Sequence, residues 1–555
     1  MILGLDVGGT QTDAVLIKDG RVLAQVKTAN RPELLDTLAE ALSEILADIP
    51  AESIRRMVFS TTMATNAIVA DDLTPAGMIV SAGPGMDPCA FAVGPSYHVV
   101  PGCMDHRGME VVPVDREAVR AAARAIRDRG IGVAGVAGKF SVRNALHETQ
   151  MAQWVQDDFS YVAMGHIFSG NLNFPRRIST AYLNAALQPI HSEFVTTLQK
   201  SLDGRGLTAP RYLMKPDGGT VRLGKSHRFP AQTAQSGPAA SVMGALALDG
   251  CKGVTLILDI GGTTTDMALT FHGVPLVEPR GITLGAYSTS IRSLLTKSIG
   301  MGGDSRVRVD DRGKLRAGPL REGSPRALGG PYPTPTDAMV HLGLLPVGEK
   351  AAADAAMAEI AGALSLDSRQ AADQVLCHMA ETIALSAEAF IFSVNCRPVY
   401  TIYEVLEGVR VRPDSVVVIG GPAAVLAPYL EKAFGLPVRV PAHAEVANAV
   451  GAAAARVTAE VSLQADTQRG TAVIPELGKE YPVRRDFSMD QALAMAKDAL
   501  TDRAFEEGAQ TDGISFAVTE KEEFNMIRGG MRAGKNIRVK ISVVPGIIPE
   551  WKFQG

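Results

Sequence analysis

One short motif occurs twice in this chain, and the repeat limits the folds that the chain can adopt. DVGGTQTD begins at Asp6 and DIGGTTTD begins at Asp259. In each copy an apolar run ends in an aspartate, a Gly-Gly-Thr turn follows, and a second apolar run leaves after the last aspartate. This pattern is typical of a strand, a tight turn and a second strand. Two copies far apart in the sequence predict two similar lobes that present their turns to one shared cleft.

A turn of this kind can bind phosphate. Glycine has no Cβ atom, so backbone N–H groups can approach a polyphosphate, and threonine hydroxyls can donate to phosphate oxygens. The aspartate that ends each first strand can hold a hydrated Mg²⁺ ion, so Asp6 and Asp259 are the predicted metal ligands and catalytic carboxylates. The alternative is a plain hairpin whose hydroxyls cap its own backbone. The predicted phosphate-binding residues are Gly8, Gly9, Thr10, Thr12, Asp13, Gly261, Gly262, Thr263, Thr264, Thr265 and Asp266.

Two segments rich in alanine and glycine accompany the motifs. One spans residues 235–248, just before the second motif, and the other spans residues 444–457. Small side chains let helices approach closely, so we expect these two helices to cross and to act as a hinge. Gly420, Gly421 and Pro422 follow the apolar strand SVVVI, and their turn is predicted to lie against an adenosine.

Taken in order, these elements resemble the superfamily of acetate and sugar kinases, heat-shock chaperones and actin. The order is phosphate motif, connecting helix, second phosphate motif, adenosine turn and second connecting helix. The resemblance implies an α/β fold in which two ribonuclease-H-like lobes enclose an ATP cleft, with ATP and Mg²⁺ as cofactors. Gly302 and Gly303 either line the nucleotide site or merely form a loop.

Within that superfamily the chain resembles the A-type, ATP-binding subunit of the hydantoinase/oxoprolinase family. Resembling segments include VFSTTMATNAIV, NALHE, MKPDGGT, QSGPAAS and GMGGDS, and the resemblance covers about Met1 to Ala459. It implies ATP-dependent activation of a cyclic amide, such as a hydantoin or 5-oxoproline, for ring opening. Relatives also serve as subunits of ATP-dependent ketone carboxylases. No B-type sequence follows, so we expect full turnover to require a B-type partner subunit.

Substrate and catalytic residues are predicted from polar groups beside apolar runs. Asp217 ends an apolar strand, and the family resemblance favours a catalytic place for it in the cleft. His147 could be the general base of the hydrolytic step, although an ordinary structural histidine is the alternative. Four further polar residues either contact the substrate or cap the helix that follows them. These are Thr61, Thr62, Thr65 and Asn66.

Composition and charge exclude several other classes. The net charge of -4 gives no electrostatic reason to expect nucleic acid as a partner. The five cysteines form no CxxC pair, so they predict neither a zinc site nor an iron–sulfur cluster. The longest apolar stretch is interrupted by Glu445 and Arg456, and the chain begins in a strand. A cytoplasmic location without a membrane span is therefore expected.

Three regions are expected along the chain. Residues 1–250 form a first lobe with inserted α/β segments, to which a helix at 445–461 returns. Residues 251–444 form a second lobe with an insert at 302–337, and residues 462–555 form a small C-terminal α/β domain. Two other functions stay open: a sugar or carboxylic-acid kinase, and a carboxylase subunit or nucleotide-switched assembly protein. A homo-oligomer is compatible with all of these functions.

Overall fold

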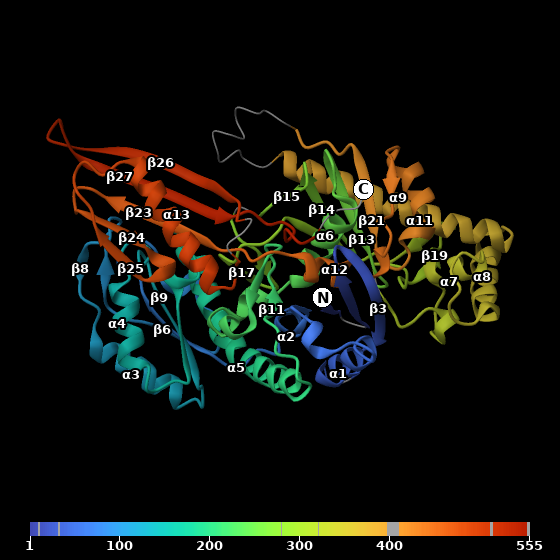
Figure 1. Cartoon of the computed structure of the whole chain (residues 1–555), viewed down its shortest axis with the longest axis horizontal. Helices are drawn as coiled ribbons and strands as arrows, with labels where there is room; N and C mark the ends of the chain where they lie inside the picture. The colour runs from blue at the N-terminus through green and yellow to red at the C-terminus, as the bar shows by residue number, and fades with distance from the viewer. Residues whose placement is uncertain are drawn as a thin grey trace.

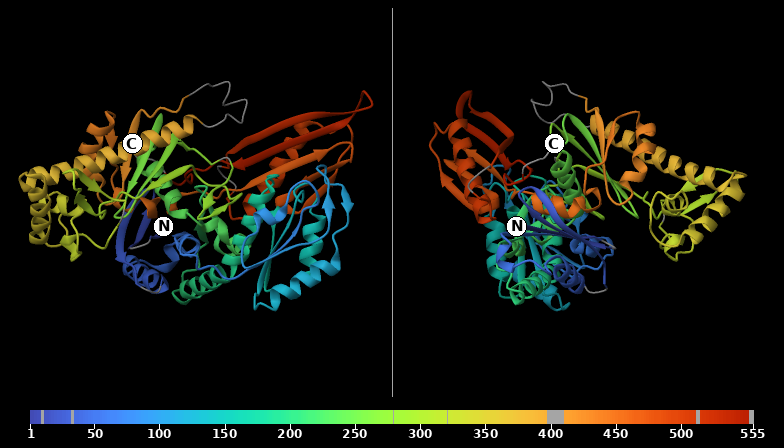
Figure 2. Two further views of the ribbon diagram at one scale, coloured as in Figure 1. Left: turned by 180° about the vertical axis from the view of Figure 1, so that it is seen from behind. Right: turned by 45° about the vertical axis from the view of Figure 1, so that its right-hand side comes forward.

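The computed structural model describes residues 1–8, 11–31, 34–278, 280–319, 321–396, 410–510 and 514–551. The molecule is elongated, with the second lobe at one end (Figure 1). An inserted domain and the C-terminal domain lie together at the other end, and the first lobe lies between the two ends. The rear and oblique views of Figure 2 show the same arrangement.

The first lobe is built on a mixed sheet of strand order β12-β11-β4-β1-β2-β3. β1 and β2 form the hairpin predicted from the first motif, with Asp6 opposite Asp13. Helix α1 (Leu34–Ile45) covers one face, where Leu38 and Leu42 are buried. The strands are β1 (Ile2–Val7), β2 (Gln11–Lys18), β3 (Arg21–Ala29), β4 (Arg56–Thr61), β11 (Arg211–Met214) and β12 (Thr220–Arg222).

The inserted domain contains a parallel sheet of its own, in the order β10-β9-β5-β6. Its central strands are buried along their whole length, which is why they read as continuous apolar runs. Helices α3 (Arg116–Arg127), α4 (Leu146–Val155) and α5 (Phe174–Gly204) pack on it. The strands are β5 (Gly77–Ser81), β6 (Ser96–Val99), β9 (Val133–Gly138) and β10 (Tyr161–Met164).

The second lobe repeats the hairpin of the first. β13 and β14 pair antiparallel with Asp259 opposite Asp266, in a sheet of order β15-β14-β13-β21-β22 that β18 joins through β14. The strands are β13 (Val254–Ile260), β14 (Thr265–Phe271), β15 (Val274–Pro275), β18 (Thr296–Ile299), β21 (Ser415–Ile419) and β22 (Val438–Arg439). The helices are α7 (Pro335–His341), α8 (Lys350–Leu364), α9 (Ser368–Asn395) and α11 (Ala423–Phe434). The fold is therefore that of the actin-like ATPases, as the sequence predicts.

Two crossing helices join the lobes. They are α6 (Ser236–Asp249) and α12 (Ala447–Ala454), which pack against each other over most of their length. The second helix is shorter than the sequence predicts, because the chain turns extended at Ala455 and continues into β23 (Glu460–Asp466).

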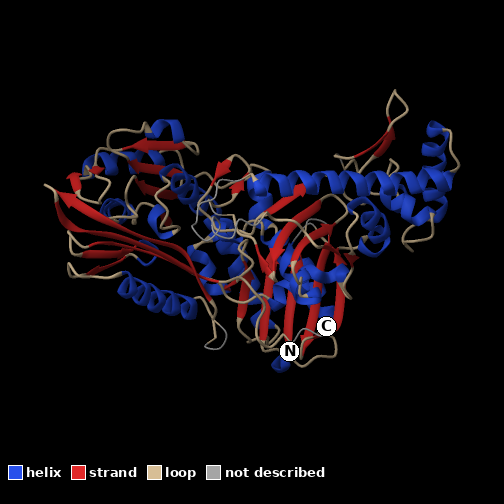
Figure 3. Cartoon of the chain, turned by 90° about the horizontal axis from the view of Figure 1, so that it is seen from above, coloured by secondary structure: helices blue, strands red, loops and turns tan. Residues whose placement is uncertain are grey.

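The C-terminal domain is an antiparallel sheet of order β25-β24-β23-β27-β26, covered by α13 (Met489–Glu506). The remaining strands are β24 (Thr471–Ile474), β25 (Lys479–Pro482), β26 (Phe516–Arg528) and β27 (Met531–Val543). In the sequence, α13 comes before both strands of the long β26–β27 hairpin. This hairpin extends to the end of the molecule in Figure 3.

Among the described helices, α9 alone is long and apolar enough to cross a membrane by length and composition. Its most apolar window is 44% buried. The buried face includes Val375, Met379 and Ile383 and packs into the core of the second lobe.

Candidate functional site

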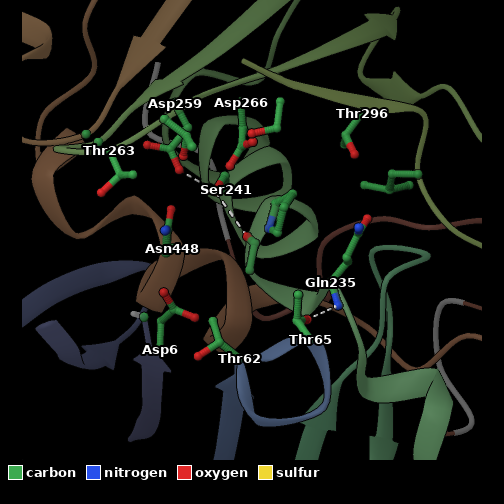
Figure 4. Close-up of a pocket in the computed structure, with 18 of the residues that line it drawn as sticks. Asp6, Thr62, Thr65, Gln235, Ser241, Asp259, Thr263, Asp266, Thr296 and Asn448 are labelled. Atoms are coloured by element: carbon green, nitrogen blue, oxygen red, sulfur yellow. Dashed lines mark hydrogen bonds between the residues drawn. The ribbon is translucent and has the colours of Figure 1, made fainter. Parts of the chain in front are cut away.

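A cleft of about 1130 Å³ lies between the two lobes, and most of the predicted nucleotide residues line it. Both hairpin turns, the turn after β21 and the beginning of helix α2 (Met63–Val69) contribute to its walls (Figure 4). The predicted residues that line it are Asp6, Gly8, Asp13, Thr62, Thr65, Asn66, Asp259, Gly261, Gly262, Thr263, Thr264, Asp266, Gly420, Gly421 and Pro422.

The two hairpin turns have the same internal bond. The Gly8 backbone N–H donates to the Gln11 carbonyl at 3.0 Å, and Gly261 donates to the Thr264 carbonyl at 3.0 Å. Equivalent motifs therefore fold into equivalent turns on opposite walls of the cleft. Gly9 and Thr10 lie outside the described residues.

Gly302 and Gly303 lie behind the second turn and do not line the cleft. The Gly303 N–H donates to the Gly261 carbonyl at 2.9 Å, and the Asp304 N–H donates to the Gly262 carbonyl at 2.7 Å. A Cβ atom on Gly302 would overlap the backbone of Gly262. The absence of side chains at Gly302 and Gly303 thus lets two backbone segments lie in contact. The segment supports the turn that begins at Gly261.

Carboxylates with raised pKa values gather at the floor of the cleft. Burial raises the pKa of Asp6 to about 6, although a hydrogen bond with Ser60 opposes the shift. Burial and the nearby charge of Asp259 raise the pKa of Asp266 to about 7. Burial also raises the pKa of Asp259, which accepts a 2.5 Å hydrogen bond from Ser241 Oγ. The floor therefore concentrates acidic groups around a cation, Lys27, which pairs with Asp13 at 2.8 Å and whose charge acts to lower the pKa of Asp259.

These carboxylates fit a divalent cation. Asp6 Oδ1 is buried and accepts no hydrogen bond from the described residues. No three His, Cys, Asp or Glu side chains in the described ranges converge as a ready-made metal site. Mg²⁺ prefers to keep several waters and to bind through one or two carboxylates and substrate phosphates, so this sparse arrangement suits it.

The turn after β21 requires glycine. Gly420 has φ of 99°, donates to the Ala444 carbonyl at 2.9 Å, and would overlap the Ile260 carbonyl if it carried a Cβ atom. A Cβ atom on Gly421 would meet open space. The cleft is therefore open beside Gly421, where a larger residue is absent.

Several predicted residues lie beside the cleft without lining it. Thr12 Oγ1 donates to Asn30 Oδ1 at 2.8 Å, and Thr265 Oγ1 donates to the Met301 carbonyl at 2.6 Å. Thr61 Oγ1 accepts from the N–H of Met63, the first residue of α2, at 3.2 Å. In this structure these three hydroxyls bond within the protein.

Asp217 and His147 lie in other parts of the molecule. Asp217 belongs to a buried ionic cluster, where Thr458 Oγ1 donates to its carboxylate at 2.8 Å. His147 Nε2 lies 3.0 Å from Glu110 Oε1, and its Nδ1 lies 3.4 Å from Ser81 Oγ, within the inserted domain. Neither residue lines the cleft, so a catalytic role for either stays a prediction.

Other cleft residues were not predicted from the sequence, among them Asn448, Ser241 and Gln235. Asn448 lies between Asp6 and Asp259 (Figure 4), and its amide lowers the pKa of both carboxyls against the larger effect of burial. Ser241 extends from α6 and donates to Asp259. Gln235 lines the cleft on the side of Thr65. Both residues belong to the segment QSGPAAS, which the sequence predicts to begin a connecting helix.

The chain belongs to the hydantoinase/oxoprolinase family. Residues 2–159 match the model described as the hydantoinase/oxoprolinase N-terminal region, and residues 177–461 match the hydantoinase/oxoprolinase model itself.

Relatives agree with this family. The caprolactamase subunit alpha of Pseudomonas jessenii is 25% identical over 428 residues, which are 70% of this chain and 59% of that protein. The acetophenone carboxylase gamma subunit of Aromatoleum aromaticum is 28% identical over 257 residues, 44% of this chain and 35% of that protein. The chain thus spans less than two thirds of the length of these relatives, which are subunits of larger enzymes.

A solved structure has the same fold. The nucleotide-free structure of acetone carboxylase superimposes with a TM-score of 0.72 at 18% identity and covers 100% of this chain and 88% of that chain.

Proposed function

We propose that this chain uses Mg-ATP to phosphorylate the carbonyl oxygen of a cyclic amide, as the ATP-binding subunit of a ring-opening enzyme. One observation carries the proposal: the turns at Gly8 and Gly261 face one cleft above a floor of carboxylates, where Asp6 Oδ1 has no hydrogen-bond partner among the described residues. The similarity to a caprolactamase subunit supports a lactam as the acceptor.

The nucleotide end of the cleft offers groups for each part of ATP. The turns at Gly8 and Gly261 would donate to the phosphates, and the turn at Gly420 would lie against the adenosine. Asp6 and Asp259 would hold a Mg²⁺ ion, which neutralises charge on the transferring phosphoryl group. Asn448 would keep these two carboxylates apart and charged.

The acceptor end combines polar and apolar groups from both lobes, and the charged residues Arg176, Glu278 and Lys297 also line the cleft. Thr62, Thr65 and Asn66 lie on the first-lobe wall at the beginning of α2. Ile282 and Leu294 add apolar surface from the second lobe. A ring with an apolar body and a polar amide matches this combination of surfaces.

The proposed reaction balances with one ATP and two waters. The ring carbonyl oxygen attacks the γ-phosphorus, the bond to the bridging oxygen breaks, and ADP leaves. Water then adds to the activated ring carbon, the C–N bond breaks with a proton going to nitrogen, and an acyl phosphate results. A second water releases phosphate. The residues above support the first step, and we assign ring opening to a B-type partner subunit.

The test is to incubate the purified chain with Mg-ATP and a panel of hydantoin, 5-oxoproline, ε-caprolactam, glycerol, glucose and acetate. ADP, phosphate and ring opening are followed separately. We expect a ring to raise ADP release well above the blank, with ring opening slow until a partner is added. Stimulation by a sugar or an acid alone, with a stable phosphorylated product, would instead identify a kinase. Equal ADP release with every compound would favour a nucleotide-switched protein.

A further inference from the structure

Gln235 adopts a left-handed backbone conformation at the wall of the cleft. It has φ of 55° and ψ of 34° immediately before α6 begins. Residues with a side chain rarely adopt this conformation, whereas glycine adopts it readily. Among the described non-glycine residues with positive φ, Gln235 is the one that lines the cleft. Backbone strain of this kind tends to occur at ligand sites, where the surrounding structure holds it in place.

The backbone around Gln235 is firmly held, but its side chain is not used. The Gln235 N–H donates to Thr65 Oγ1 at 2.7 Å, and Ser236 Oγ donates to the Thr61 carbonyl at 3.0 Å. The side-chain carboxamide of Gln235 makes no hydrogen bond to any residue in the described ranges. In Figure 4 this side chain extends from the Thr65 side of the pocket toward Thr296 on the opposite wall.

The Gln235 carboxamide can pair with one particular kind of ligand group. It presents an N–H donor and a C=O acceptor side by side. A secondary amide in a small ring is held cis, so its own C=O and N–H lie on one edge, whereas an open-chain secondary amide is almost entirely trans. Two parallel hydrogen bonds can therefore join the Gln235 carboxamide to a ring amide, and only one can join it to an open-chain amide.

This pairing is compatible with phosphoryl transfer. A carbonyl oxygen has two lone pairs, so one can accept from the Gln235 N–H while the other faces the nucleotide. The ring N–H that donates to the Gln235 carbonyl also polarises the amide and raises electron density on its oxygen. The bound ring would thus be oriented by this side chain, with one lone pair of its carbonyl oxygen free to face the nucleotide.

We propose that Gln235 is a specificity-determining residue that recognises the cis-amide edge of a ring with a free N–H, such as a lactam or a hydantoin. This inference rests on the proposed function and names the substrate class more closely. Thr65 acts as a positioning residue, because its hydroxyl holds the backbone of Gln235 in the conformation that directs the carboxamide into the cleft.

The test compares ε-caprolactam with N-methylcaprolactam as stimulants of ADP release by the full chain. In the wild type, N-methylation removes one of the two bonds and should lower kcat/KM roughly tenfold or more. Gln235→Gly should lower kcat/KM for ε-caprolactam by a similar factor and reduce the discrimination between the two rings to near one. Gln235→Glu keeps the shape but removes the donor, and it should also lose activity with ε-caprolactam.

Two controls separate recognition from folding. The Kd for Mg-ATP, measured by calorimetry, should be the same in Gln235→Gly and the wild type. Its Tm should not fall, because glycine tolerates positive φ. If the wild type responds to a ring but does not discriminate against N-methylation, or if Gln235→Gly keeps the discrimination, the role of Gln235 is overturned while the proposed function stands. If no ring stimulates the wild type, the proposed function fails, and this inference fails with it.

Discussion

Gly244 of α6 and Gly451 of α12 face each other where the two connecting helices cross. A Cβ atom on Gly451 would overlap the Ala240 carbonyl oxygen and crowd the backbone nitrogen of Gly244. A Cβ atom on Gly244 would overlap the Ala447 carbonyl oxygen. These neighbours are backbone atoms and cannot rotate away, so the helices approach more closely than any side chain would permit.

Alanine at either glycine should push α6 away from α12. We expect Gly244→Ala and Gly451→Ala to lower the free energy of unfolding by about 1–3 kcal/mol, and to reduce ATP turnover of the folded fraction as well. Chemical denaturation and kcat measure the two effects. Gly362→Ala in α8 is the matched control, because its Cβ atom meets open space and should be neutral or stabilising by about 0.5–1 kcal/mol. Wild-type turnover in both crossing variants would remove the hinge role.

Asp259→Asn should weaken the use of Mg-ATP. An amide is a poor ligand for Mg²⁺, and the variant also changes the partner of Ser241 Oγ. We expect kcat/KM for Mg-ATP to fall by an order of magnitude or more, with a rise in the Mg²⁺ concentration needed for half-maximal turnover. Asp311→Asn, an exposed acid in the turn between β19 (Val307–Val309) and β20 (Leu315–Ala317), serves as the control. Equal Mg²⁺ dependence in the two variants would contradict the metal assignment.

The repeated motif predicted most of the fold because both copies obey the same local rules. An apolar run ending in aspartate, followed by Gly-Gly-Thr, forms the same hairpin in both lobes, with Asp6 opposite Asp13 and Asp259 opposite Asp266. The two segments rich in alanine and glycine likewise predicted the crossing helices. These features depend on residues that are close together in the sequence, so they can be predicted from it.

The rest of the site depends on contacts between distant segments. Gly302 was predicted either to line the nucleotide site or to form a loop, and its contact with the backbone of the second turn exists only once the insert folds back. In the sequence, Asp217 follows an apolar run, as the cleft aspartates do. This local pattern cannot show whether the aspartate lies at a cleft or at a boundary between domains. The conformation of Gln235 has no local signal in the sequence, because its backbone is held by a hydrogen bond from its N–H to Thr65 Oγ1, a residue 170 positions away in α2.

The contribution of Asp266 to the stability of the protein without ligand should fall as pH rises toward neutrality. Asp266 in the folded protein keeps its proton up to about pH 7, whereas in the unfolded chain an aspartate loses it near about pH 4. The folded state therefore binds more protons in this interval, and the free energy of unfolding decreases with rising pH, by up to about 1.4 kcal/mol per unit for each retained proton.

Chemical denaturation at about pH 4.5–7.5 measures how the free energy of unfolding changes with pH. Asp266→Asn should make this pH dependence weaker, whereas Asp311→Asn should not. Mg-ATP favours the charged carboxylates, so the stabilisation it provides should grow over the same interval. A slope that is unchanged in Asp266→Asn would mean that this carboxyl is ionised throughout.

Asp217 joins three parts of the molecule at a buried cluster. Its carboxylate lies 3.8 Å from Lys215 Nζ in the first lobe and 3.7 Å from the Arg292 guanidinium in the second. Thr458, which leads into the C-terminal domain, donates to it. Burial acts to raise the pKa of Asp217, but these cations and the hydroxyl outweigh it and hold the pKa below its ordinary value.

Asp217→Asn should therefore destabilise the protein more than it impairs the chemistry. Removing the charge leaves Lys215 and Arg292 buried with less compensation, which should cost about 3 kcal/mol of unfolding free energy. Asp203→Asn is the matched control, because Asp203 is an exposed acid paired with Arg211, and its loss should cost at most about 1 kcal/mol. ATP turnover per folded molecule, stimulated by a ring, should stay close to wild type in both variants. A loss of turnover in Asp217→Asn at wild-type stability would instead support the catalytic role predicted from the sequence, with the carboxylate reaching the cleft in a conformation other than this one.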